Sequence, residues 1–283
     1  MSIPIYQVDS FADVAFKGNP AGVCLLRAPA EETWMQQVAA EMNLSETAFL
    51  SPQADDEYAL RWFTPAVEVE LCGHATLAAA HILWESEMLP ARAPARFRTA
   101  SGLLIATHRD DHIQLDFPVT PPQAVEPPDG LLDALGVTPV YVGQTRSDYL
   151  VEVDNADVVR DASPDIRALV RYGIRGAMIT ARSDEPAYDF ISRFFAPGAG
   201  VDEDPVTGSA HCALAPYWSA RLAQDALVGY QASARGGIVR CRVLMIASCS
   251  AVTPSRCCAE SCSPSRSVCL MRCPTMRSGV CES

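Results

Sequence analysis

The order of apolar and polar residues along this chain predicts strands in most places and helices in a few. Residues 31–42 carry apolar side chains three and four positions apart, which is the spacing of one helix face. Elsewhere, short apolar runs separated by turn-forming Gly, Pro and Asp predict strands. These strands cover residues 3–9, 21–26, 47–51, 58–63, 140–153, 177–181 and 188–195, with a meander over 97–117 that turns at Ser101-Gly102 and Asp110-Asp111.

One short pattern occurs twice. Residues 71–80 are Leu-Cys-Gly-His-Ala-Thr-Leu-Ala-Ala-Ala, and residues 206–215 are Val-Thr-Gly-Ser-Ala-His-Cys-Ala-Leu-Ala. Each copy predicts an Ala-rich helix that starts at a Gly, over 73–84 in the first case and from Gly208 in the second. The repeat indicates a duplicated unit. We therefore expect an α+β protein with two similar halves.

The predicted boundaries follow composition. Residues 120–129 hold four Pro, so 119–129 is the expected linker between an N-terminal half, 1–118, and a C-terminal half, 130–243. Residues 244–283 form a separate tail rich in Cys, Ser and Arg, with no strand or helix periodicity.

Composition and charge exclude several classes of function. Hydrophobic residues make up 49% of the 283 and charged residues 20%, as in soluble globular proteins. A net charge of −12 argues against nucleic acid or an anionic membrane as a partner. No apolar run reaches the roughly 18 residues of a membrane span, and the first residues lack a signal-peptide pattern. We expect a cytosolic (cytoplasmic) protein.

Cysteine is distributed unevenly. Of the 11 Cys, only Cys24, Cys72 and Cys212 come before residue 241, which is typical of a reducing compartment. The crowding of the others after that point would suit a disulfide framework, but this conflicts with the Cys-poor remainder. A zinc knuckle needs regular Cys pairs, which the tail does not contain.

We interpret the tail as the product of a frameshift near residue 243. Its first eleven residues can be encoded so that a shifted reading frame gives a strand–turn–strand pattern. A genuine tail would cost the second half its last strands and leave unpaired sheet edges. Resequencing the gene tests this hypothesis, and an intact in-frame read across residue 243 would contradict it.

The stretch 198–209 combines a loop that carries two Gly and three carboxylates with the start of the second Ala-rich helix at Gly208. Gly198 and Gly200 permit a close approach of the backbone to a ligand. The unpaired N–H groups that open the helix at Gly208 and Ser209, with the helix dipole, form an anion site. If the halves face each other, both helix starts converge on one small anionic ligand. The alternative is a capped helix after a solvated acidic loop.

Glu46 is the candidate acid–base group. Asn43 and Glu46 fit a capping box, three residues apart, but Thr47-Ala-Phe-Leu is strand-like, so no good helix follows to be capped. Burial of a carboxylate at the start of an apolar strand would raise its pKa, as proton transfer requires.

Other titratable residues give weaker signals. His74 lies at a predicted helix start, which favours a neutral imidazole, although a lone His is more often structural. His81 looks like a packing residue, and His211 has no partner at metal-ligand spacing. No metal or nucleotide motif is present, so we expect neither. Cys72 could be an activated thiol, but a two-base racemase needs a second thiol where this chain has Thr207.

Five segments of the chain form a recognisable set: Gly18–Val23, Asn43–Phe49, Phe63–Thr76, Arg193–Gly198 and Glu203–His211. Together they resemble the phenazine-biosynthesis isomerase-like (PhzF-like) family, within the diaminopimelate epimerase-like fold. Residues 231–237 also look like a later Gln…Arg-Gly element of that family, and the likeness covers about residues 1–243.

The resemblance implies two pseudo-symmetric domains, each a curled, mostly antiparallel sheet around a central helix, and a homodimer. It implies an isomerase without cofactor or metal that moves a proton on a small carboxylate, similar to the dihydro-hydroxyanthranilate isomerase of phenazine biosynthesis. Glu46 would transfer the proton, while Gly73, His74, Asp204, Gly208 and Ser209 would bind the substrate. The alternatives are an epimerase or racemase of the same fold and a non-catalytic dimeric protein that binds a small ligand.

Overall fold

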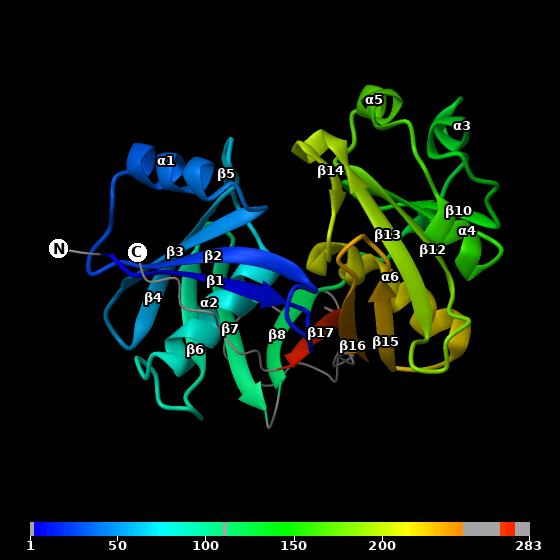
Figure 1. The fold of residues 1–283 in the computed structure, drawn as a ribbon. Coiled ribbons are helices and arrows are strands. Elements are labelled where there is room, and N and C mark those ends of the chain that lie inside the picture. Colours follow the sequence, from blue (N-terminus) through cyan, green and yellow to red (C-terminus); the bar gives the residue numbers. More distant parts are fainter. Residues whose placement is uncertain (1–2, 110–111, 246–266, 275–283) are drawn as a thin grey trace, which may run out of the picture.

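Two lobes, each with strands curled around one long helix, make up the protein (Figure 1). The computed structural model describes residues 3–109, 112–245 and 267–274. The first lobe is built from β1 (Ile5–Ser10), β2 (Asn19–Leu25), α1 (Glu32–Met42), β3 (Glu46–Pro52), β4 (Glu57–Phe63), β5 (Glu68–Val69), α2 (Gly73–Glu85), β6 (Ala95–Thr99), β7 (Gly102–Arg109) and β8 (His112–Pro118).

The rest of the chain builds the second lobe and the region between the lobes. Its elements are β9 (Gln123–Ala124), α3 (Leu131–Leu135), β10 (Tyr141–Gln144), β11 (Asp148–Glu152), α4 (Ala156–Asp161), α5 (Ile166–Leu169), the 3₁₀ turn η1 (Val170–Tyr172), β12 (Gly176–Arg182), β13 (Phe190–Ala196), the 3₁₀ turn η2 (Pro197–Ala199), β14 (Val201–Asp204), α6 (Gly208–Leu222), β15 (Ala226–Gln231), β16 (Gly237–Met245) and β17 (Ser267–Pro274).

A continuous ladder of strand pairs connects the two lobes within the described residues. Most neighbours are antiparallel, but β2 with β3, β4 with β6, β11 with β12 and β13 with β15 are parallel. The antiparallel run β8–β17–β16–β15 carries the sheet from the first lobe into the second. The lobes are therefore joined by backbone hydrogen bonds as well as by the linker.

α2 is the central helix of the first lobe. It is apolar on nearly every side and packs against β1, β2, β3 and β8. A helix without a polar face must be surrounded by protein, which explains why the sheet curls around it. The core around α2 also includes Val206, Cys212 and Val239 from the second half of the sequence, so the lobes share apolar packing where they meet.

α6 is the corresponding helix of the second lobe, and it contains Pro216. A proline cannot donate the helical hydrogen bond to the carbonyl four residues earlier, which belongs to Cys212. The N–H of Thr120, in the Pro-rich segment, donates to that carbonyl at 2.9 Å. The Pro-rich segment thus satisfies a buried group that the proline leaves open, and β9 of the same segment pairs with β10.

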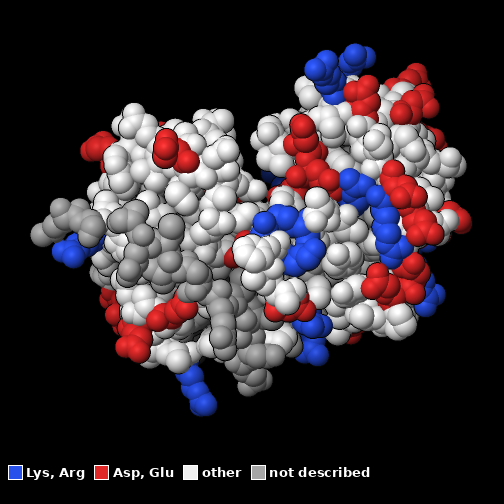
Figure 2. Space-filling view, in the orientation of Figure 1, with Lys and Arg blue, Asp and Glu red and all other residues white. Residues whose placement is uncertain are grey.

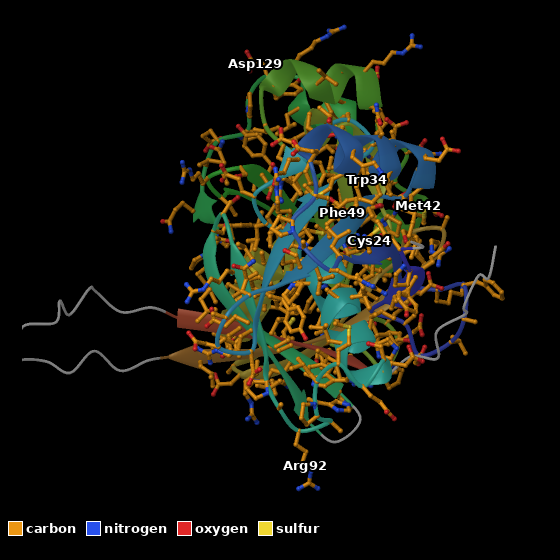
Figure 3. The ribbon with its side chains drawn as sticks, turned by 90° about the vertical axis from the view of Figure 1, so that its left-hand side faces the viewer. Cys24, Trp34, Met42, Phe49, Arg92 and Asp129 are labelled. Carbon is orange, nitrogen blue, oxygen red and sulfur yellow. The ribbon has the colours of Figure 1, made fainter. Side chains whose placement is uncertain are left out.

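α1 covers the outer face of the first sheet. Its Trp34 meets Phe49 of β3 edge-to-face at 6.1 Å, close to Cys24 of β2 (Figure 3). The helix ends at Asn43, which adopts the left-handed conformation at φ 50°. Asn43 is thus a C-cap. Glu46 begins the strand β3, which confirms the expectation that no helix follows it and excludes the capping-box alternative.

Most of the predicted elements are confirmed, including both Ala-rich helices with the register of the repeat. The N-cap is Cys72 in α2 and Thr207 in α6, as the aligned pattern requires. The short helices α4 and α5 are not predicted, although the side chains of Asn155 and Asp165 cap their starts. Residues 201–204 form β14 rather than the expected loop.

The expectation that the tail supplies no strand is wrong for residues 267–274. They form β17, which pairs with both β16 and β8, so neither of those strands is left as an open edge there. Strand pairing uses backbone groups, which any sequence except Pro supplies. The predicted turn at Asp110-Asp111 and the rest of the proposed frameshifted tail, 246–266 and 275–283, lie outside the described residues.

No helix in the described part of the chain is both long and apolar enough to span a membrane.

Candidate active site

A cavity of about 260 Å³ lies between the two lobes, where the starts of α2 and α6 meet. The space-filling view shows the surface drawn inward between the lobes (Figure 2). Residues of both halves line the cavity, from β3, α2 and β8 on one side and from β11, β13, β14 and α6 on the other. All six predicted site residues are among them: Glu46, Gly73, His74, Asp204, Gly208 and Ser209.

Gly73 and Gly208 bring the two helix starts together. A Cβ atom added to Gly73 would lie 3.8 Å from the Cα of Gly208. The side chain of Thr207, the N-cap residue of α6, forms no capping hydrogen bond with its own helix. N–H groups and the positive ends of two helix dipoles therefore remain available to an anion in the cavity.

Glu46 is the first residue of β3, and its side chain is only 19% exposed. Burial raises the pKa of Glu46 to about 8, and the negative charge of Asp204 adds to the rise. Its Oε2 lies 3.3 Å from Nε2 of His74. A carboxyl with this pKa can both accept and release a proton near neutral pH.

His74 is held in the first turn of α2. The Ser10 hydroxyl donates to its backbone carbonyl at 2.7 Å, and its Nδ1 lies 3.5 Å from the sulfur of Cys72. Burial lowers the pKa of His74 to about 3, so the imidazole is neutral. His74 is therefore neutral, as the sequence predicts, and the main cause is burial rather than the helix dipole.

The Cys72 thiol is fully protonated at neutral pH. Burial, followed by the charge of Glu46, raises the pKa of Cys72 well above its usual value. Cys72, His74 and Glu46 each offer one atom of a kind that can bind a metal ion, and these three atoms lie within 4.8 Å of one another. The sequence could not predict this grouping, because Glu46 begins strand β3 whereas Cys72 is the N-cap of α2, far along the chain. The expectation that no metal is bound stays a prediction.

Asp204, at the end of β14, is fixed by both halves of the chain. Its carboxylate accepts hydrogen bonds from Nδ2 of Asn19 at 2.8 Å and from the hydroxyl of Thr207 at 2.5 Å. Burial raises the pKa of Asp204 to about 6, although these hydrogen bonds act to lower it. Gln231 holds the same turn, since it accepts from the Thr207 N–H and donates to the Asp204 carbonyl.

The other two carboxylates of the acidic stretch do not join the site. Asp202 is exposed to solvent. Glu203 forms a two-pronged ion pair with Arg193, with distances of 2.7 and 2.9 Å. The crowding of like charges seen in the sequence is relieved because successive residues of β14 point to opposite faces, which turns Glu203 away from its two acidic neighbours and toward Arg193.

Arg175 is a site residue that the sequence analysis missed. It precedes β12, and its Nη1 donates to the hydroxyl oxygen of Ser209 at 2.8 Å. Its other edge faces Asp148, to which Nε donates at 2.8 Å. No motif surrounds Arg175 in the sequence. Only the parallel pairing of β11 with β12 brings it beside Asp148 and the cavity.

The remaining histidines named in the sequence analysis have other surroundings. His81 lies 3.4 Å from Glu85 on α2, one helical turn further on. His211 is fully buried in α6, and its Nδ1 lies 2.8 Å from the carbonyl oxygen of Thr207. Neither residue lines the cavity.

Comparisons with known proteins agree with this architecture. The sequence profile of a family described as phenazine biosynthesis-like protein (PhzC-PhzF) matches residues 8–252. An uncharacterized isomerase of Halalkalibacterium halodurans is 51% identical over 244 residues, which are 86% of this chain and 92% of that relative.

Solved structures are similar over almost the whole chain. A PhzF-family phenazine biosynthesis protein from Enterococcus faecalis superimposes with a TM-score of 0.84 at 36% identity, covering 99% of this chain and 98% of the other. A probable proline racemase from Agrobacterium radiobacter has a TM-score of 0.62 at 12% identity, covering 98% and 92%. The predicted α+β, diaminopimelate epimerase-like fold class is confirmed.

Proposed function

This chain belongs to the phenazine biosynthesis-like (PhzC-PhzF) family of isomerases, and we propose that it moves a proton on a small carboxylate substrate by acid–base catalysis without a cofactor. The observation that best supports this is the Glu46 carboxyl, which lies in the cavity between the lobes with a pKa of about 8. The other carboxyl on the cavity wall with a raised pKa, Asp204, already accepts hydrogen bonds from Asn19 and Thr207, so Glu46 is the better candidate to give and take a proton near neutral pH.

In the proposed reaction, the Glu46 carboxylate removes a proton from a carbon of the substrate. The electron pair of the broken C–H bond moves into the adjoining unsaturated system. The protonated Glu46 then returns the proton to another carbon, so that a double bond shifts and atoms and electrons balance. One buried carboxyl is enough for both steps if the substrate carbons stay within its reach.

The other predicted residues would hold the substrate during these steps. The N–H groups at Gly73 and Gly208 and the hydroxyl of Ser209 offer donors to a carboxylate. The neutral His74 and the carboxyl of Asp204 would orient the rest of the molecule by hydrogen bonds. These assignments are part of the proposal.

The test is solvent-deuterium incorporation into a panel of cyclic and amino-acid carboxylates. Wild type, Glu46→Gln and Glu41→Gln would be compared, because Glu41 is an exposed carboxylate near the end of α1 and controls for the substitution itself. We expect deuterium at a substrate carbon with wild type and Glu41→Gln, and none with Glu46→Gln.

Other outcomes distinguish the alternatives. Exchange with inversion of one stereocentre and no shift of a double bond would favour an epimerase or racemase. Binding of a carboxylate by the folded protein, with no exchange in any variant, would favour a non-catalytic binding protein.

We also propose that the protein acts as a cytoplasmic homodimer. The net charge of −12 and the absence of a spanning helix among the described residues are compatible with this assignment. Sedimentation equilibrium of the purified protein tests the dimer, and a monomer at every concentration would contradict it. Cell fractionation tests the compartment.

A further inference from the structure

Arg175 is the centre of a chain of hydrogen bonds that ends in the cavity. Strands β11 and β12 are parallel with Asp148 opposite Gly176, so the residue before Gly176 lies beside Asp148. Arg175 donates through Nε and Nη2 to the two oxygens of Asp148, whose side chain is 5% exposed. Its guanidinium carbon lies 5.2 Å from the centre of the Phe194 ring. Together, these contacts hold the guanidinium group in a single orientation.

The third guanidinium nitrogen, Nη1, determines in which direction Ser209 can hydrogen-bond. Nη1 of Arg175 donates to the Ser209 oxygen at 2.8 Å. A hydroxyl has one hydrogen to donate, and an oxygen that already accepts from a cation is a stronger donor through that hydrogen. Because both Ser209 and Arg175 line the cavity, the serine O–H and the second Nη1 hydrogen are both available to a ligand there.

We propose that the chain Asp148–Arg175–Ser209 makes the site select a carboxylate over a neutral group of the same shape. Arg175 positions Ser209 as a hydrogen-bond donor toward the ligand and offers its own second Nη1 hydrogen beside it. Asp148 fixes Arg175 and balances its charge. The inference rests on the proposed function for the identity of the ligand as a carboxylate, but its test measures binding and needs no turnover.

A cavity with two donors at one place accepts both oxygens of a carboxylate. The matching amide would turn its NH₂ group toward one of those donors, and the unmatched donor would lose its partner. The preference for a carboxylate over an amide therefore requires Ser209 to donate its hydrogen to the ligand. Arg175 ensures this, because it already donates to the Ser209 oxygen. Arg146, an exposed cation on the same cavity wall, supplies charge without this hydrogen bond.

The experiment compares the Kd of benzoate with that of benzamide by ligand-observed NMR, since the two probes have the same shape and differ in charge. We expect wild type to prefer benzoate. The double variant Arg175→Met, Asp148→Asn removes both members of the buried ion pair, so that no lone charge is left inside. Its preference for benzoate should fall by about 10- to 100-fold.

Two further variants make the test decisive. In Ser209→Ala, the preference for benzoate over benzamide should fall to a similar extent. If circular dichroism shows that the double variant does not fold, Ser209→Ala alone provides the test. Arg146→Met should change the ratio much less. An equal loss in Arg146→Met, a ratio unchanged in Ser209→Ala, or wild type without a preference would each overturn the proposal. Glu46→Gln should keep the preference, so a failure of proton transfer is distinguished from a failure of carboxylate selection.

Discussion

Nε2 of His74 lies 3.3 Å from Oε2 of Glu46, and near neutral pH the carboxyl, not the imidazole, carries the proton of this pair. Burial favours the uncharged form of both groups, because it raises the pKa of Glu46 to about 8 and lowers that of His74 to about 3. The site thus pairs a carboxylic acid with a neutral imidazole rather than an ion pair.

The first prediction concerns the pH dependence of proton transfer. Abstraction from carbon needs the ionised form of Glu46, whose fraction increases about tenfold per pH unit below the pKa. We expect kcat/KM for deuterium incorporation to rise up to about pH 8 and to level off above it. A rate profile already level at pH values just above 4.5, the ordinary carboxyl value, would contradict this assignment.

The second prediction concerns stability. Because the pKa of Glu46 is about 8 in the folded protein against 4.5 for an ordinary glutamate, the folded state holds a proton that the unfolded state has lost over that pH window. The stability that Glu46 supports is therefore full below the lower value and decreases as pH rises through the window. Glu46→Gln, which has no charge to bury, should be more stable than wild type at pH 8 by on the order of a few kcal/mol.

Thermal unfolding at a series of pH values measures this difference. The Tm of Glu46→Gln should approach that of wild type near the ordinary glutamate pKa of 4.5 and exceed it increasingly toward pH 8. Groups other than Glu46 titrate in both proteins, so the comparison isolates the one carboxyl. A constant difference in Tm across the whole range would show that Glu46 is not buried as a neutral acid.

The third prediction tests the coupling between the two carboxyls of the cavity. The charge of Asp204 contributes, after burial, to the raised pKa of Glu46. Asp204→Asn removes that charge and should shift the rising limb of the pH–rate profile to lower pH, alongside any loss of rate. Asp202→Asn is the matched control, since Asp202 lies on the same strand but faces solvent. A shift of the same size in both variants would show a general charge effect and not a local one.

Glu46, His74 and the glycines could be predicted from the sequence because each stands in a local pattern, whereas the binding roles of Asp204 and Ser209 come from the family resemblance of residues 203–211. The repeat around Cys72 and Thr207 predicts where both helices begin, and a helix start has a known chemistry whatever its tertiary surroundings. Strand character after Glu46 also ruled out a capped helix. Local pattern and tertiary structure agree at these residues, so the fold class and these positions in the cavity could be predicted.

Arg175 and Asp148 could not be predicted in the same way. Their ion pair exists only because β11 and β12 run parallel in register, and nothing within either segment specifies that register. The same holds for β17, whose pairing with β8 joins segments that are far apart in the chain. Contacts set by non-local strand pairing leave no signal in a single sequence.

The last prediction concerns Gln231, which is fully buried and secures the turn that carries Asp204 and Thr207. Its side-chain oxygen accepts from the Thr207 N–H at 2.9 Å, and its amide donates to the Asp204 carbonyl at 2.7 Å. Gln231→Leu keeps the volume but leaves both backbone groups without these partners. The expected cost is about 2–6 kcal/mol in the free energy of unfolding, because each of the two unsatisfied groups costs about 1–3 kcal/mol.

Urea unfolding and exchange kinetics together check this role. Because the turn also aims the start of α6, Gln231→Leu should reduce the rate of deuterium incorporation even under conditions where the variant is fully folded. Gln224→Leu, at an exposed position after α6, provides the matched control and should change stability by less than about 0.5 kcal/mol. If the two variants behave alike in both measurements, Gln231 does not secure the turn, and the geometry of Asp204 must depend on Asn19 and Thr207 alone.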